Sequence, residues 1–154
     1  MTKKFVIIIG GGYEQLPFIR ISKKNGFKTI VIDRNQLCIG FREADIKFKI
    51  STYNYKKIIS RLIKLNFKSK VKYVINRSSG LPVFTAANLY KFINFPHTPT
   101  KSAKILTYKD KLYKFCKENF IKIPKTKVYQ KSNYKISINK IIKPAISLVG
   151  KQSV

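Results

Sequence analysis

Three consecutive glycines, Gly10-Gly11-Gly12, stand between an apolar run and an amphipathic segment. Glycines between a strand and a helix let a ligand approach the backbone, and free N–H groups at the helix start attract an anion. The dinucleotide fingerprint G-x-G-x-x-G is met only in part, because Gln15 occupies its third glycine position. Asp33 ends the next apolar run, where a ribose-binding acid lies in dinucleotide-binding folds. The pattern indicates a site for a phosphate or acidic small molecule, or a tight turn without a ligand.

A second turn of the same kind is Arg77-Ser78-Ser79-Gly80, again between an apolar run and an amphipathic segment. Ligands of open parallel sheets collect at the carboxyl ends of the strands. A guanidinium, two hydroxyls and a glycine beside a helix start suit a carboxylate or a phosphate. The alternative is a capped helix start beside a surface arginine.

Two lysines in the second half of the chain stand at ends of predicted elements. Lys109 lies in the first turn of a predicted helix, and Lys143 closes an apolar strand before Pro144. Backbone N–H groups in such a loop, with a lysine beside them, can form a phosphate cradle. The segment Gly150-Lys151-Gln152-Ser153 is not a Walker motif, since G-x-x-x-x-G-K-[ST] is absent. The alternative for Lys143 is a solvated strand end.

The sequence offers little for metal, redox or acid–base chemistry. His97 is the only histidine, and Cys38 and Cys116 have neither metal-binding nor redox spacing. Six acidic residues in the whole chain leave few carboxylates for general acid–base work or for holding magnesium. We therefore expect no metal site in this chain.

The elements that must position these residues follow from the hydrophobic pattern. Continuous apolar runs are typical of parallel strands buried on both faces, and amphipathic segments between them are typical of helices. The pattern predicts strands over 5–9, 28–32, 48–50 and 71–75, and helices over 14–24, 54–64 and 81–93. Alternation of this kind predicts an α/β fold with an open, doubly wound parallel sheet over residues 1–95.

Residues 96–154 form a second predicted portion of mixed α+β type. A loop with two prolines leads into a short helix that begins at Thr100 or Ser102 and ends at Leu106. Thr107 stands three residues before Asp110, close to a capping box, and is expected to open a helix that runs to Glu118. Further strands are expected over 126–129 and 138–143.

The charge is strongly positive, with 33 lysines and arginines against 6 acids and a formal net charge of +27. Specific nucleic-acid-binding proteins gather such charge on one helix or face, whereas these lysines are scattered from Lys3 to Lys151. Richness in Ile, Asn, Tyr and Phe besides Lys is typical of A/T-rich codons. We therefore expect nucleic acid not to be the partner, and an acidic partner is the alternative.

The apolar run from Phe5 to Ile9 is too short for a signal-peptide core or a membrane span. The two cysteines are expected to be buried or incidental free thiols. The sequence therefore predicts a soluble cytoplasmic protein that does not engage a membrane.

The order of the motifs resembles the start of an ATP-grasp ligase of the carbamoyl-phosphate-synthase and biotin-carboxylase type. The opening strand and glycine turn resemble the family's pre-ATP-grasp domain, and later segments resemble its "iltdK", "ngIpvP" and "vvKP…GkgsGv" motifs. The segments that carry the resemblance are Val6 to Gln15, Ala44-Asp45, Asn76 to Gly80, Lys104 to Lys109, Asn119 to Pro124, Ile141 to Pro144 and Gly150 to Val154.

The resemblance implies ATP as cofactor and magnesium as its counterion in the family. It implies that Lys109 and Lys143 contact the nucleotide, and that Gly150, Lys151 and Ser153 belong to a loop that folds over the phosphates. The implied reaction activates a carboxylate through an acyl phosphate, which an amine or similar nucleophile attacks. The two glycine turns and Asp33 are then the expected substrate-binding residues.

Three features depart from the family pattern. Tyr108 replaces the family's Asp before the first lysine, and Leu148, Val149 and Gln152 stand where small residues are usual. The family's adenine-holding acid and magnesium ligands come after the phosphate loop, in which Val154 ends this sequence. We therefore expect an N-terminal fragment that binds nucleotide weakly, is inactive alone, and associates as a homodimer or through an unfinished sheet edge. The alternatives are a non-catalytic Rossmann-like module for a dinucleotide or small ligand, and a basic nucleic-acid-binding protein.

Overall fold

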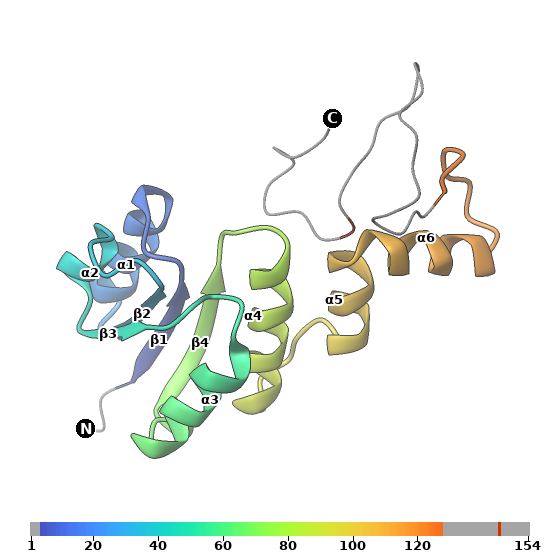
Figure 1. Cartoon of the computed structure of the whole chain (residues 1–154). Helices are drawn as coiled ribbons and strands as arrows, with labels where there is room; N and C mark the ends of the chain where they lie inside the picture. The colour runs from blue at the N-terminus through green and yellow to red at the C-terminus, as the bar shows by residue number, and fades with distance from the viewer. Residues whose placement is uncertain (1–3, 128–144, 146–154) are drawn as a thin grey trace.

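The computed structural model describes residues 4–127 and Ala145 (Figure 1). Four strands form one all-parallel sheet in the order β3-β2-β1-β4. They are β1 (Phe5–Ile9), β2 (Lys28–Asp33), β3 (Ile46–Lys49) and β4 (Val71–Asn76). The chain builds outward from β1 to β3 and then returns to the other side of β1 for β4, so the strand order reverses between β1 and β4. The predicted α/β fold with an open, doubly wound parallel sheet is confirmed.

Helices cover both faces of the sheet (Figure 1). The segments are η1 (Tyr13–Gln15), α1 (Leu16–Lys24), α2 (Gly40–Glu43), α3 (Tyr55–Lys64) and α4 (Leu81–Phe92). One face packs against α1 and α2, and the other packs against α3 and α4. The sequence did not predict α2, because a helix of four residues is too short to show a helical period.

Strand β1 lies at the centre of both hydrophobic cores. Phe5, Ile7 and Ile9 pack into the core beneath α3 and α4, while Val6 and Ile8 pack into the core beneath α1 and α2. Successive side chains of a strand point to opposite faces, so a strand covered on both sides needs apolar residues at every position. This explains the continuous apolar run that identified β1 in the sequence.

Helix α3 is fixed by its cap and by its apolar stripe. The side-chain oxygen of Asn54 accepts a hydrogen bond from the N–H of Lys57 at 3.0 Å, which satisfies a donor that the first turn would otherwise leave unpaired. Ile58 and Leu62 are fully buried against the sheet. The opposite side of the helix is exposed and carries Lys57, Arg61 and Lys64.

The edge strand β3 is tied to β2 through Asp45, which precedes it. The Asp45 carboxylate accepts hydrogen bonds from the N–H and the hydroxyl of Thr29, at 2.9 and 3.0 Å, and pairs with Lys28 at 2.8 Å. Partial burial raises the pKa of Asp45, but the hydrogen bonds from Lys28 and Thr29 and the charge of Lys23 outweigh it and lower the pKa to about 2. The ionised carboxylate therefore helps to hold the start of β3 beside β2.

Two further helices, α5 (Thr100–Thr107) and α6 (Lys109–Glu118), follow α4 in a row (Figure 1). The prediction that Thr107 opens the second of these helices is wrong. Its hydroxyl donates to the carbonyl oxygen of Ala103 at 2.7 Å, so Thr107 completes α5, and the extended residue Tyr108 precedes α6. A threonine hydroxyl can bond one turn back as well as cap forward, which the sequence does not distinguish.

The remaining expectations concern the C-terminal part. Residues 126 and 127 are irregular, and the rest of the expected strand 126–129 lies outside the described residues, as does the expected strand 138–143. Among the residues that the structure describes, no helix has the length and apolar character needed to cross a membrane.

Candidate functional site

The glycine turn after β1 is closed by its own hydrogen bonds. Its three N–H groups donate within the chain: Gly10 to the carbonyl oxygen of Ile32 at 2.9 Å, Gly11 to Oδ2 of Asp33 at 2.8 Å, and Gly12 to Oε1 of Gln15 at 3.0 Å. The N–H groups of the three glycines are therefore not available to an anion in this conformation, while ligand binding at the turn stays a prediction.

The departure from the dinucleotide fingerprint has a structural reason. Gln15, which replaces the third glycine, is buried and uses its side-chain oxygen to hold the N–H of Gly12. The mismatch at Gln15 was visible in the sequence, but its role as an internal partner of the turn depends on the folded geometry.

Asp33 links the turns that follow β1 and β2. Its Oδ2 accepts from Gly11 and its Oδ1 accepts from the N–H of Asn35 at 2.8 Å. Both carboxylate oxygens therefore bind main-chain donors of the protein itself, and in this conformation they tie the two turns together.

Close packing also explains why Gly11 is a glycine. A Cβ atom built on Gly11 would lie 2.4 Å from Sγ of Cys38, and one built on Gly40 would lie 2.9 Å from Cα of Gly11. The N–H of Gly40 donates to the carbonyl oxygen of Gly11 at 2.7 Å, which holds the start of α2 against the turn. Burial raises the pKa of the Cys38 thiol, so Cys38 is a neutral packing group here.

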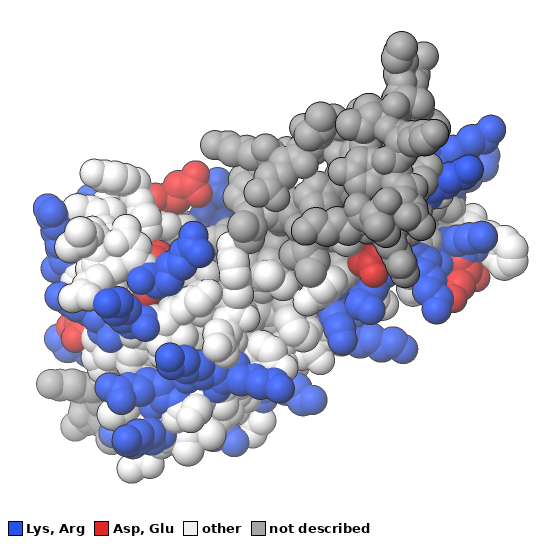
Figure 2. Space-filling model, in the orientation of Figure 1, with Lys and Arg blue, Asp and Glu red and all other residues white. Residues whose placement is uncertain are grey.

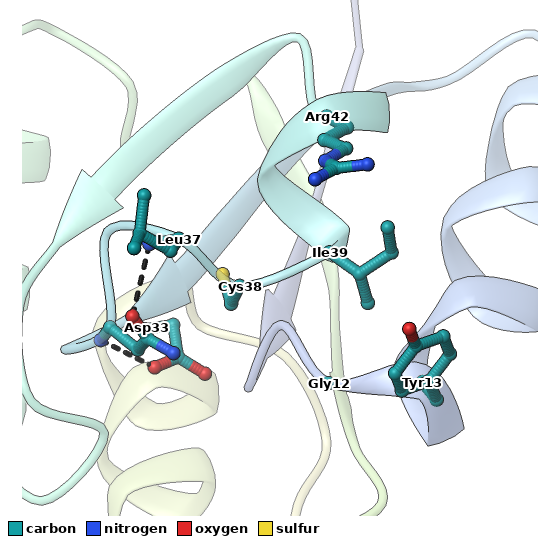
Figure 3. Close-up of a pocket in the computed structure, with 8 residues that line it drawn as sticks. Gly12, Tyr13, Asp33, Leu37, Cys38, Ile39 and Arg42 are labelled. Atoms are coloured by element: carbon teal, nitrogen blue, oxygen red, sulfur yellow. Dashed lines mark hydrogen bonds between the residues drawn. The ribbon is translucent and has the colours of Figure 1, made fainter.

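A cavity of about 360 Å³ opens between the turns after β1 and β2 (Figure 3). It contains two of the predicted site residues, Gly12 and Asp33, and is further lined by Tyr13, Asn35, Leu37, Cys38, Ile39 and Arg42. Arg42 projects from α2 and Tyr13 from η1, with Ile39 between them (Figure 3). Sequence reasoning missed these three residues, because α2 shows no helical period and the lining comes together only on folding.

The second predicted turn lies at the same edge of the sheet. Ile9 pairs with Asn76 in the parallel ladder, so the turn that begins at Arg77 leaves the sheet beside the glycine turn. The Asn76 side chain donates to the carbonyl oxygen of Ser78 at 2.7 Å and accepts from its N–H at 3.2 Å, which tightens this turn. Arg77 and Ser79 are exposed, and Gly80 has a positive φ of 72° that favours glycine.

These two turns flank the point at which the strand order reverses. Open α/β sheets bind ligands at such a switch point, outside the carboxyl ends of the strands. The structure thus brings Gly10-Gly11-Gly12 and Arg77-Ser78-Ser79-Gly80 to adjacent strand ends. The 360 Å³ cavity instead lies on the β2 side of β1, and the second turn does not line it.

The second group of predicted residues lies at the start of α6. The N–H of Lys109 donates to the carbonyl oxygen of Ala145 at 2.9 Å. This contact brings a residue of the C-terminal part, two positions after Lys143, to the helix that begins at Lys109. Lys143, Gly150, Lys151 and Ser153 themselves lie outside the described residues.

The carboxylates of the described residues do not gather in one place. Within residues 4–127, no group of three or more His, Cys, Asp or Glu side chains could hold a metal ion. Near Lys109, Asp110 has one buried carboxylate oxygen without a hydrogen-bond partner. One carboxylate does not make a magnesium site.

No protein-family model matches the chain, and no curated protein matches it either. Solved structures do match. An L-amino acid ligase from Bacillus licheniformis matches with a TM-score of 0.61 at 15% identity, over 96% of this chain and 39% of that chain. The N5-carboxyaminoimidazole ribonucleotide synthetase from Thermotoga maritima matches with a TM-score of 0.52 at 25% identity, over 79% of this chain and 32% of that chain.

A third match is the biotin carboxylase domain of the 2-oxoglutarate carboxylase from Hydrogenobacter thermophilus, which was crystallised as a dimer with MgADP and bicarbonate. It has a TM-score of 0.51 at 18% identity, over 77% of this chain and 28% of that chain. The chain thus spans between 28% and 39% of the length of these three proteins. The parallel sheet, its strand order and these matches together show that the chain has the fold of the N-terminal, pre-ATP-grasp part of ATP-grasp ligases.

Proposed function

We propose that this chain takes part in ATP-dependent ligation, in which a carboxylate is activated as an acyl phosphate and then attacked by an amine or similar nucleophile. The observation that carries the proposal is the hydrogen bond between the N–H of Lys109 and the carbonyl oxygen of Ala145. It joins the two segments on which the nucleotide-binding lysines are expected. The fold shared with ATP-grasp ligases supports the same reading.

The nucleotide would be held by Lys109 and Lys143, with Gly150, Lys151 and Ser153 over its phosphates. ATP, when bound, supplies the phosphoryl group that activates the carboxylate. Lysine ammonium groups bind phosphate oxygens as point charges and hold the phosphates in place. The biotin carboxylase domain with MgADP shows that a protein of this fold binds nucleotide.

The carboxylate substrate would bind at the turn after β4. The exposed guanidinium of Arg77 has the planar pair of donors that matches a carboxylate, and the hydroxyls of Ser78 and Ser79 add hydrogen bonds. The glycine turn after β1 would form the neighbouring wall of this site. It would not donate hydrogen bonds from its three glycine N–H groups, because these already bond to other groups of the chain.

Magnesium does not fit the described residues. Among them, Asp110 is the acid nearest in sequence to Lys109, and no acidic cluster accompanies it. We therefore assign no step to a metal held by this part of the protein. Our proposal for the chain by itself is nucleotide binding without turnover, as a fragment of a ligase.

Association with a second copy, either as a homodimer or through an open sheet edge, belongs to the same proposal. Strands β3 and β4 end the described sheet on its two sides. Unpaired edges favour pairing with another chain. Light scattering after size-exclusion chromatography would show twice the 17.9 kDa of the monomer. A single species at the monomer mass at high protein concentration would refute association.

Nucleotide binding is tested by titrating the protein with MgADP and MgATP in a calorimeter. The Lys109→Gln variant should bind at least about tenfold more weakly, the loss expected for about 1.4 kcal/mol of a charge-assisted contact. The Lys117→Gln variant, which removes an exposed lysine of the same helix, is the matched control and should bind as the wild type does.

Two results would contradict the proposal. One is binding of NAD with no response to ADP or ATP, which would favour a Rossmann-like module. The other is an equal loss of nucleotide affinity in both lysine variants, which would point to unspecific charge attraction.

A further inference from the structure

The acids of this chain are distributed far less evenly than its lysines. The six acidic residues are Glu14, Asp33, Glu43, Asp45, Asp110 and Glu118. Residues 46–109 therefore contain no carboxylate side chain, although they supply β3, α3, β4, α4 and α5. Lysines that look scattered along the sequence are thus left without opposing charge on one part of the fold.

Helix α3 is the centre of this acid-free surface. Lys57, Arg61 and Lys64 follow the spacing i, i+4 and i+7, which places them on one stripe of the helix. All three are exposed, and among the described residues the ion pairs involve other cations, on α1, β2 and α6. Figure 2 shows blue side chains gathered over the face where α3 lies, with no red among them. The stripe is therefore a row of positive charges that could bind phosphate groups, since none of the ion pairs among the described residues involves it.

A groove lies at the end of the stripe, where α3 and α4 both stop. It has a volume of about 420 Å³ and falls within the range of about 300–1,000 Å³ typical of ligand sites. Its lining consists of Ile63, Asn66, Lys68, Ser69, Ile93 and Asn94. The groove lies near the end of the stripe, because Lys64 is the last residue of α3 and Asn66, which lines the groove, follows two residues later.

The two helices end in the same way at this groove. Asn66 and Asn94 each have a positive φ, of 52° and 56°, directly after the last turns of α3 and α4. The last carbonyl oxygens of both helices are bonded within the chain, for example that of Leu62 by the N–H of Phe67 and that of Tyr90 by the N–H of Phe95. A ligand in the groove therefore meets mainly side chains, among which Lys68 brings a positive charge. The two asparagine amides add donors and acceptors, and Ile63 and Ile93 offer apolar surface to a ring.

We propose that this face binds a single-stranded nucleic acid, with its phosphates along Lys57, Arg61 and Lys64 and one base in the groove. The inference goes beyond the proposed ligase function, since the face lies apart from the turns after β1 and β4. An acidic peptide fits less well, because its carboxylates would match the stripe but would leave the asparagine amides and the apolar surface of the groove unused. A duplex fits less well, because its bases are paired and stacked and cannot enter a groove.

Binding of a fluorescently labelled, mixed-sequence single-stranded oligonucleotide would be followed by anisotropy over a series of salt concentrations. The variant Lys57→Gln/Arg61→Gln/Lys64→Gln should bind at least about tenfold more weakly, and its slope of log K against log salt should be smaller by about 2, as expected for three lost phosphate contacts. The matched control is Lys4→Gln/Lys24→Gln/Arg34→Gln, which removes the same charge from exposed positions outside residues 46–109. It should keep most of the affinity and most of the salt slope.

The groove is tested with an abasic strand of the same length. The wild type should bind the normal strand several-fold more tightly than the abasic strand, and the variant Asn66→Gly/Asn94→Gly should lose this preference. Glycine accepts the positive φ at both positions, so the helices should keep their ends. Circular dichroism would confirm that each variant is folded.

Four results would overturn the proposal: no binding at low salt, equal losses in the stripe variant and its control, equal affinity for the abasic strand, or equal competition by a duplex. Competition by polyglutamate at the same concentration of charge would instead assign the face to an acidic protein.

Discussion

The main-chain N–H of Lys109 lies 2.9 Å from the carbonyl oxygen of Ala145, so the first residue of α6 is bonded to a distant part of the chain through its backbone. The side chain of Lys109 is not needed for this hydrogen bond. Lys109→Gln therefore removes the charge and keeps the contact, whereas Lys109→Pro removes both, and the difference between the two variants isolates the contact.

The variant Lys109→Pro should keep α6 but lose the link to Ala145. Proline lacks the N–H, yet it suits the first position of a helix, and the preceding residue Tyr108 is already extended, as proline requires. If the link positions the nucleotide site, ADP affinity should fall by about tenfold below that of Lys109→Gln, which loses the charge but keeps the link; this corresponds to about 1.4 kcal/mol. Calorimetry measures the affinity, and circular dichroism should show unchanged helix content. An ADP affinity of the folded Lys109→Pro variant equal to that of Lys109→Gln would show that the link is not used.

The variant Gly11→Ala should be destabilised by about 1–3 kcal/mol, because its new methyl group would overlap the sulfur of Cys38. The double variant Gly11→Ala/Cys38→Ala removes that sulfur and should recover part of the loss. Gly12→Ala serves as the control, since its nearest neighbour is the flexible end of Gln15 at 3.2 Å. Urea unfolding compares the four proteins, and an equal loss in both single variants would contradict this explanation of Gly11.

Replacing Asp33 with Asn should cost about 1–3 kcal/mol of folding free energy. An amide presents one oxygen instead of two, so one of the N–H groups of Gly11 and Asn35 would face a donor. The exposed acid of the neighbouring η1 provides the control variant Glu14→Gln, which should change stability by less than about 0.5 kcal/mol. Urea midpoints that coincide for the two variants would exclude the linking role of Asp33.

Stability should fall in acid partly through Asp45. Its pKa is about 2 in the folded protein and about 3.9 in an unfolded chain, so its contribution is complete above about pH 4 and is lost as the pH falls through about 2. Solvent screens a surface group of this kind, so we expect a loss of about 1 kcal/mol. The difference between the wild type and Asp45→Asn, measured by urea unfolding, should shrink over this range. A difference that stays constant from about pH 5 to about pH 2 would contradict the assignment.

The buried strands could be predicted from the sequence because each contains a run of apolar residues. The run Phe5 to Ile9 is apolar throughout, as a strand covered on both faces must be, and the structure places it at the centre of the sheet. The third strand is less regular, and it spans Ile46–Lys49 rather than the expected 48–50. Its edge position leaves alternate side chains exposed, which weakens the apolar signal.

The site was less predictable because it depends on contacts between distant residues. The glycines marked the turn correctly, but the sequence alone did not show that Gln15 and Asp33 occupy its donors or that Gly40 packs against Gly11. The same reason explains the face of α3. Each cation was visible in the sequence, whereas the lack of nearby acids became meaningful only once α3 was seen to lie on a face without acidic side chains (Figure 2).

The hydrogen bonds within the glycine turn fix the shape of its main chain independently of any ligand. Because Gly10, Gly11 and Gly12 use their N–H groups internally, the turn keeps its form without a ligand. If a small molecule binds here as proposed, the side chains around the turn, such as Tyr13, Arg42 and Arg77, would recognise it. A change of ligand would then need substitutions of these side chains, with no change to the main chain beneath them.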